Sequence, residues 1–89
     1  MDLKRALNSI GKSAFIKYYY NFKNMSREYC ISNFEENYTH TAKVTRTNYA
    51  KRIFREGKQL EALKIIIQSK RVDDLTHTKA IEILNTETK

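Results

Sequence analysis

The chain has 89 residues, and 17 Lys and Arg outnumber 10 Asp and Glu, so that the formal net charge at pH 7 is +7. It has no proline and two glycines, too few turn residues for an all-β fold with many tight turns. One cysteine excludes an intrachain disulfide, and no apolar run could span a bilayer or serve as a signal peptide. We therefore expect a single small cytoplasmic domain over residues 1–89.

The positive charge is unevenly distributed along the chain. Residues 1–58 carry the whole excess, whereas residues 59–89 hold equal numbers of basic and acidic side chains. Such segregation is typical of a surface that binds a polyanion such as nucleic acid. A second explanation is codon bias, because the chain is rich in Ile, Lys, Asn and Tyr, which AT-rich genomes favour.

The N-terminal half is predicted to form two helices. Apolar residues at helical spacing begin at Leu3, and Tyr18 and Phe22 extend the same stripe, with Asp2 as the N-cap. The aromatic run 14–22 could also form a strand, but no second strand-like run exists to pair with it. The second helix covers Arg27–Glu36, capped by Asn24 or Ser26, and buries Tyr29 or Cys30 together with Ile31 and Phe34.

Three further helices are predicted after a connector at 35–39. The third runs from His40 to Glu56, with Gly57 as its C-terminal stop. The fourth buries Leu60, Leu63, Ile66 and Ile67 and has Lys70 and Arg71 in its last turn, where positive charge suits the helix dipole. The fifth starts at Asp73 or Asp74 and buries Leu75, Ala80, Ile83 and Leu84, leaving 85–89 as a frayed tail. The predicted fold is an all-α, compact orthogonal bundle of about five helices.

The segment Arg-Glu-Gly-Lys-Gln-Leu-Glu-Ala-Leu-Lys at 55–64 resembles the turn and following helix of a tetratricopeptide-type hairpin. The resemblance covers one hairpin, whereas such arrays need several repeats to be stable. It therefore implies a helical hairpin that closes the core.

The basic helix at 40–56 is the main candidate for function. On a helical wheel, Ala42, the stem of Arg46, Tyr49, Ala50 and Ile53 point inward. The residues predicted to meet base edges are Val44, Thr47, Asn48 and Lys51, and those predicted to meet phosphates are Lys43, Arg46, Arg52, Arg55 and Lys58. Asn can pair with adenine, and an exposed Val or Thr can touch a thymine methyl group. Each of these cations could equally be a solvated residue whose stem covers apolar neighbours.

The order of parts in 27–56, a short helix, a connector and a basic helix, is similar to that of a helix-turn-helix. The resemblance is architectural, because the glycine common in the turn is missing. The leading interpretation is a DNA-binding regulator or accessory factor, of the kind encoded by phages and mobile elements, that acts as a homodimer on double-stranded DNA.

Tyr18, Tyr19 and Tyr20 support a rival interpretation. Three consecutive tyrosines point in different directions around a helix, so at least one should be exposed. Exposed tyrosines beside lysines stack on bases or form protein interfaces. The rival function is a protein-binding inhibitor or adaptor, RNA binding is a third option, and the two candidate dimer faces are Tyr18–Phe22 and the hairpin 60–84.

Catalysis has little support in the sequence. His40 and His77 are isolated from each other and from Cys30, and no Cys/His or carboxylate cluster has metal-ligand spacing. Gly11-Lys12-Ser13 matches only the end of a phosphate-binding loop, without the upstream glycine and strand. We therefore expect no enzyme activity, no metal and no cofactor.

Overall fold

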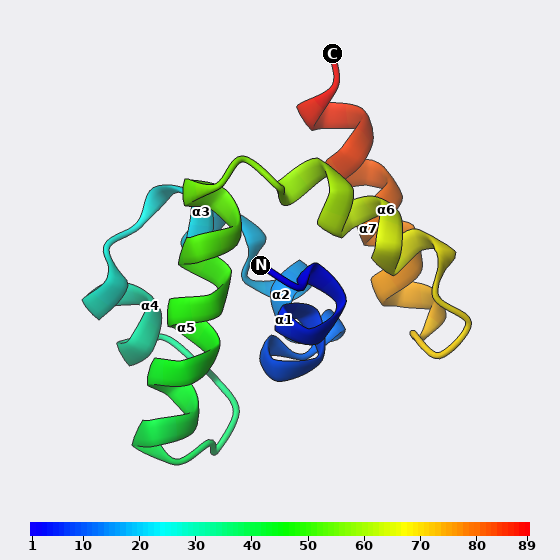
Figure 1. Ribbon diagram of the computed structural model, residues 1–89. Coiled ribbons are helices and arrows are strands. Elements are labelled where there is room, and N and C mark those ends of the chain that lie inside the picture. Colours follow the sequence, from blue (N-terminus) through cyan, green and yellow to red (C-terminus); the bar gives the residue numbers. More distant parts are fainter.

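The computed structural model describes all 89 residues and contains seven helices and no strand, which confirms the all-α prediction (Figure 1). The helices are α1 (Leu3–Ile10), α2 (Lys12–Lys17), α3 (Tyr19–Asn24), α4 (Arg27–Ser32), α5 (His40–Arg55), α6 (Gln59–Gln68) and α7 (Asp74–Glu87). The longest helix, α5, is central, since α1, α3, α4 and α6 all pack on it. None of the helices combines the length and apolarity required to cross a membrane.

The predicted first helix is divided into α1, α2 and α3. Gly11 ends α1 with a φ of +90°, a conformation open to glycine but strained for other residues, and its N–H donates to the carbonyl of Leu7 at 2.8 Å. A second break at Tyr18 separates α2 from α3. A straight helix would have pointed several aromatic rings into water, whereas the two breaks bury Phe15, Tyr18, Tyr19 and Phe22 together.

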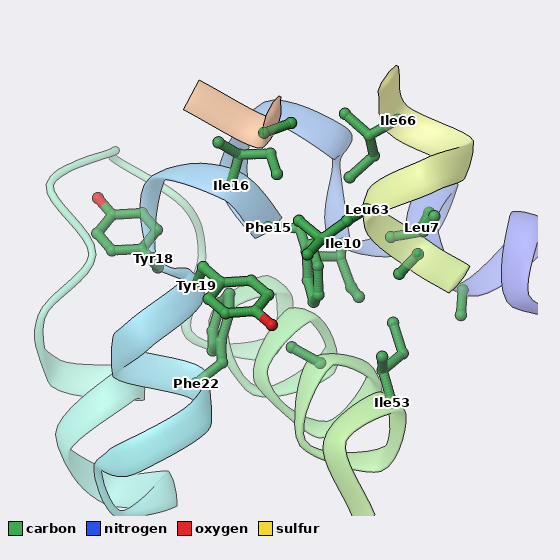
Figure 2. Close-up of a cluster of buried hydrophobic side chains, with 14 of the residues drawn as sticks. Leu7, Ile10, Phe15, Ile16, Tyr18, Tyr19, Phe22, Ile53, Leu63 and Ile66 are labelled. Atoms are coloured by element: carbon green, nitrogen blue, oxygen red, sulfur yellow. The ribbon is translucent and has the colours of Figure 1, made fainter. Parts of the chain in front are cut away.

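Aromatic rings form the centre of the core (Figure 2). Phe15 lies edge-on to Tyr19 with a centroid distance of 5.6 Å, and it stacks on Phe54 of α5 at 5.9 Å. Leu63 and Ile66 of α6 reach the same cluster, as Figure 2 shows. The aromatic side chains of the N-terminal segment therefore pack between α5 and the C-terminal hairpin.

Helix α4 is shorter than predicted, because it ends at Ser32 and residues 33–39 form an irregular connector. Phe34 is still buried, and its ring meets that of Tyr18 at 5.0 Å. The hydroxyl of Tyr18 donates to a carboxylate oxygen of Glu36 at 2.6 Å and accepts the N–H of Glu35 at 2.9 Å. These bonds hold the connector against α2 and α3, so the aromatic segment that was predicted as part of one helix also anchors a loop.

The C-terminal half agrees with the predicted helix boundaries and buried residues except at three points. Gly57, with a φ of +69°, follows α5 as expected, and the Asp73 carboxylate accepts the N–H of Thr76 at 3.1 Å as the N-cap of α7. Lys70 and Arg71 lie beyond the end of α6 rather than in its last turn. Leu75 is 77% exposed, and Thr76 is buried instead, because the cap sets the orientation of the first turn of α7.

The third difference is the predicted frayed tail at 85–89. Helix α7 continues through Glu87, whose carboxylate accepts hydrogen bonds from Tyr19 at 2.8 Å and from Lys23 at 2.9 Å. The end of α7 is therefore attached to α3 by a buried tyrosine and a lysine.

Candidate nucleic-acid interface

The exposed face of α5 is rotated from the predicted one. Its exposed residues after the first turn are Thr45, Asn48, Arg52 and Arg55, at spacings of three and four. The wheel assumed one buried face, whereas α5 is covered on several sides by α1, α3, α4 and α6. The face open to solvent is consequently a narrow strip along the helix.

Three of the four predicted base-contacting residues are not on this strip. Thr47 has an exposed fraction of 0%, so the prediction that it points outward is wrong. Val44 and Lys51 are half-buried, and the Lys51 ammonium donates to the backbone carbonyl of Met25. Only Asn48 is exposed, and the other three are covered by neighbouring segments that pack on α5.

Arg46 is half-buried and held inside the protein at two points. Its guanidinium donates to the backbone carbonyl of Ile10 and lies 3.9 Å from the centre of the Tyr38 ring. The inward direction predicted for its stem is confirmed. Its charged end faces the junction of α1 and α2, away from the Asn48–Arg52–Arg55 side of α5.

The other predicted phosphate contacts divide into two groups. Arg52 and Arg55 are exposed on the strip, whereas Lys43 and Lys58 are half-buried. Arg52 forms an ion pair with Glu56 at 2.5 Å, one turn later in the chain. The guanidinium is the first cause of the lowered pKa of the Glu56 carboxyl. Arg55 has no ion pair and no side-chain hydrogen bond, so its charge is available to a ligand.

A shallow hollow of about 330 Å³ lies along the strip. We call its lining residues the α5 strip, and they are Thr45, Asn48, Tyr49, Arg52 and Arg55. No carboxylate lines this hollow, although Glu56 is bonded to the edge of it through Arg52. The half-buried ring of Tyr49 gives the hollow one aromatic wall.

Arg27 of α4 joins the α5 strip, and sequence reasoning missed it. Its Nε donates to the Oδ1 of Asn48 at 2.8 Å, so that a third arginine is bonded to the α5 strip. Nothing in the local sequence marks Arg27, because its position depends on how the irregular connector returns α4 to α5. The bond uses one of the two lone pairs of the Asn48 amide oxygen and leaves its two N–H donors free.

The predicted tyrosine surface is largely absent. Tyr18 and Tyr19 are buried, so their assignment to an interface is wrong, and only Tyr20 is exposed, at 41%. Burial is the first cause of the raised pKa of both buried phenols. Their hydroxyl groups are used internally, by Glu36 and Glu87, because a buried hydroxyl group needs a hydrogen-bond partner.

The side chains associated with catalysis or metal binding are dispersed. Cys30 is buried, its thiol donates to the carbonyl of Asn21 at 3.2 Å, and burial raises its pKa. No group of three His, Cys, Asp or Glu side chains is arranged to hold a metal ion. His77 lies with its Nε2 2.8 Å from the carbonyl of Ile67, and it thus links α7 to α6.

Comparisons of the chain with protein-family models, with curated proteins and with solved structures found no match.

Proposed function

We propose that this protein is a non-catalytic DNA-binding protein that holds the phosphate backbone of double-stranded DNA with the α5 strip and Arg27. The observation that supports this proposal best is a hollow without a lining carboxylate that is lined by two exposed arginines, Arg52 and Arg55, and whose Asn48 is bonded to a third, Arg27. Arginine presents five donors in a planar fork that matches phosphate oxygens.

The same geometry favours backbone contacts over base reading. Bidentate recognition of adenine needs both a donor and an acceptor of the Asn48 amide to approach the base, and the Arg27 guanidinium already lies against the acceptor oxygen. The free amide donors of Asn48 and the hydroxyl of Thr45 suit phosphate oxygens, which only accept hydrogen bonds. We therefore propose binding with weak sequence preference, in place of a major-groove reader, by an accessory factor of the mobile-element type.

The salt dependence of duplex binding tests the proposal. A titration of a labelled generic duplex, followed by fluorescence anisotropy, should show binding at about 50 mM salt and a steep loss towards about 200 mM. Absence of binding at the lower salt concentration would overturn the proposal. A single-stranded RNA of matched length, titrated in parallel, tests RNA as the alternative ligand.

The α5 strip is tested by the double variant Arg52→Gln/Arg55→Gln. Removing two phosphate contacts should lower the slope of log affinity against log salt by about two. The matched control is Lys64→Gln/Lys89→Gln, which removes the same charge from two exposed lysines that have no ion pair. Equal effects of both variants would show that overall charge, rather than the strip, controls binding.

The adaptor hypothesis is the weaker one, because two of the three tyrosines that would form its interface are buried. A pull-down that returns one stoichiometric protein partner, with no duplex binding, would favour it over the DNA proposal.

The helix-turn-helix likeness of α4 and α5 is not needed for backbone binding. We retain the homodimer as part of the proposal, through the hairpin α6–α7, since the Tyr18–Phe22 face is buried apart from Tyr20 and Asn21.

A further inference from the structure

A second basic surface lies at the junction of α1 and α2, opposite the end of α6. Two adjoining hollows of about 330 and 300 Å³ share Asn8 and Lys12 in their walls. Three of the lining cations, Lys4, Lys12 and Arg71, form no ion pair and no side-chain hydrogen bond. The remaining polar groups are amides and hydroxyls, and no carboxylate lines either hollow.

Arg46 gives one of these hollows a fixed cation. Its stacking on Tyr38 and its bond to the Ile10 carbonyl hold the guanidinium in the wall formed with Gly11, Lys12 and Ser13. A Cβ atom at Gly11 would lie 3.0 Å from Arg46 Nη1, so the glycine also provides the room that the guanidinium occupies. A cation that is already ordered loses little side-chain entropy when it binds an anion.

We infer that this surface is a second phosphate-binding site, with Arg46 and Lys12 as its centre and Lys4 and Arg71 at its rim. We call it the α1–α2 site. The inference rests on the proposed function, because the phosphate groups that it would hold are those of the same nucleic acid. In Figure 1, helix α1 lies between α5 and α6, and the side chain of Arg46 reaches from α5 to the junction of α1 and α2.

The carboxylate of Asp73 lies beside the α1–α2 site but does not line either of its hollows. Asp73 accepts from the hydroxyl of Ser13 at 3.3 Å and from the hydroxyl of Thr76 at 2.6 Å, in addition to capping α7. These bonds point it towards the neighbouring hollow, which it lines with Thr76, and it forms no ion pair with Lys12 or Arg71. A diester phosphate therefore meets an excess of positive charge.

The experiment compares duplex binding by the full chain and by the variant Lys12→Gln/Arg71→Gln. Neither side chain makes a bond within the protein, so the fold should be retained, which the urea midpoint checks. The slope of log affinity against log salt should fall by about two, and the control Lys64→Gln/Lys89→Gln should leave it unchanged. In an amide NMR titration with the duplex, the Gly11 and Lys12 signals should shift.

The failures of the two ideas are distinguishable. If Arg52→Gln/Arg55→Gln lowers the slope and Lys12→Gln/Arg71→Gln does not, the α1–α2 site is wrong and the proposed function stands. If the duplex does not bind at all, both are overturned. If inorganic phosphate or a mononucleotide shifts the Gly11 and Lys12 signals but the duplex does not, the ligand is a free phosphate and the assignment to nucleic acid is overturned.

Discussion

Thr47 and Asn48 are neighbours in the sequence with opposite environments. Thr47 is fully buried and its hydroxyl has no hydrogen-bond partner, whereas Asn48 is exposed and bonded to Arg27. A buried hydroxyl without a partner costs free energy of folding, because it gives up hydrogen bonds to water. The packing of four helices on α5 thus buries Thr47 although its side chain is polar.

The substitution Thr47→Val should increase the free energy of unfolding by about 1 kcal/mol, because it replaces an unpaired buried hydroxyl with a methyl group of similar shape. Urea denaturation measures the change, and duplex affinity should remain the same. Thr45→Val, on the exposed side of the same helix, is the control and should change stability by less than about 0.5 kcal/mol. A loss of stability in Thr47→Val would mean that the hydroxyl is satisfied after all.

The candidate site could be predicted from the sequence only in part. The inward direction of Tyr49, Ala50 and Ile53 followed from helical periodicity, and so did the exposure of Arg55. The capture of Lys51 by the Met25 carbonyl and the approach of Arg27 to Asn48 could not follow from it. Both depend on the position of α4, which is a tertiary property.

Among the helices, α3 and α7 are joined most directly by polar bonds. Glu87 accepts bonds from Tyr19 and Lys23, and the bond from Lys23 is the first cause of the lowered pKa of its carboxyl. Since this pKa is lower in the folded protein than the ordinary value of 4.5, the bonds stabilise the fold above about pH 4.5. Their contribution is lost as pH falls through the folded pKa.

The variant Glu87→Gln should therefore be less stable than the original protein at pH 7, by about 1 kcal/mol, and closer to it at pH 3. Thermal unfolding at the two pH values gives the comparison. Glu82→Gln lies on the same helix, is exposed and has no hydrogen bond or ion pair, so it should have little effect at pH 7. An undiminished difference at pH 3 would contradict the role of the charged carboxylate.

Element type was easier to predict than element boundaries. Helix caps and glycine stops can be recognised from the local sequence. The structure has helix ends at the caps Asp2, Ser26 and Asp73 and at the stop Gly57. The break at Tyr18 has no such mark. It results from the burial of rings that a continuous helix would have exposed, which becomes apparent only when the whole core is assembled.

At the scale of the molecule, the net positive charge belongs to residues 1–58. Residues 59–89 are neutral, and within them Leu75 is 77% exposed beside a hollow lined by Ile16 and Lys79. Two copies of a protein with a charge of +7 repel each other least through the part of the chain that has no net charge. The face around Leu75 is consequently the one on which a homodimer is expected.

The substitution Leu75→Ser should convert the proposed homodimer to a monomer, because it removes the most exposed apolar side chain of the hairpin with little effect on the core. Light scattering at the concentrations used for binding measures the mass. Tyr20→Ser, at the other candidate face, should leave the mass unchanged. A one-chain mass for the original protein would contradict the homodimer.

The single thiol of the molecule, that of Cys30, lies on the buried side of α4, the helix that brings Arg27 to the α5 strip. Because Cys30 is covered and bonded to the Asn21 carbonyl, a thiol reagent reaches its sulfur only when α4 has moved away. The rate of Cys30 alkylation under native conditions thus reports how often α4 detaches from the rest of the protein. A ligand that bridges Arg27 and Arg55 would lower the alkylation rate without contacting the cysteine.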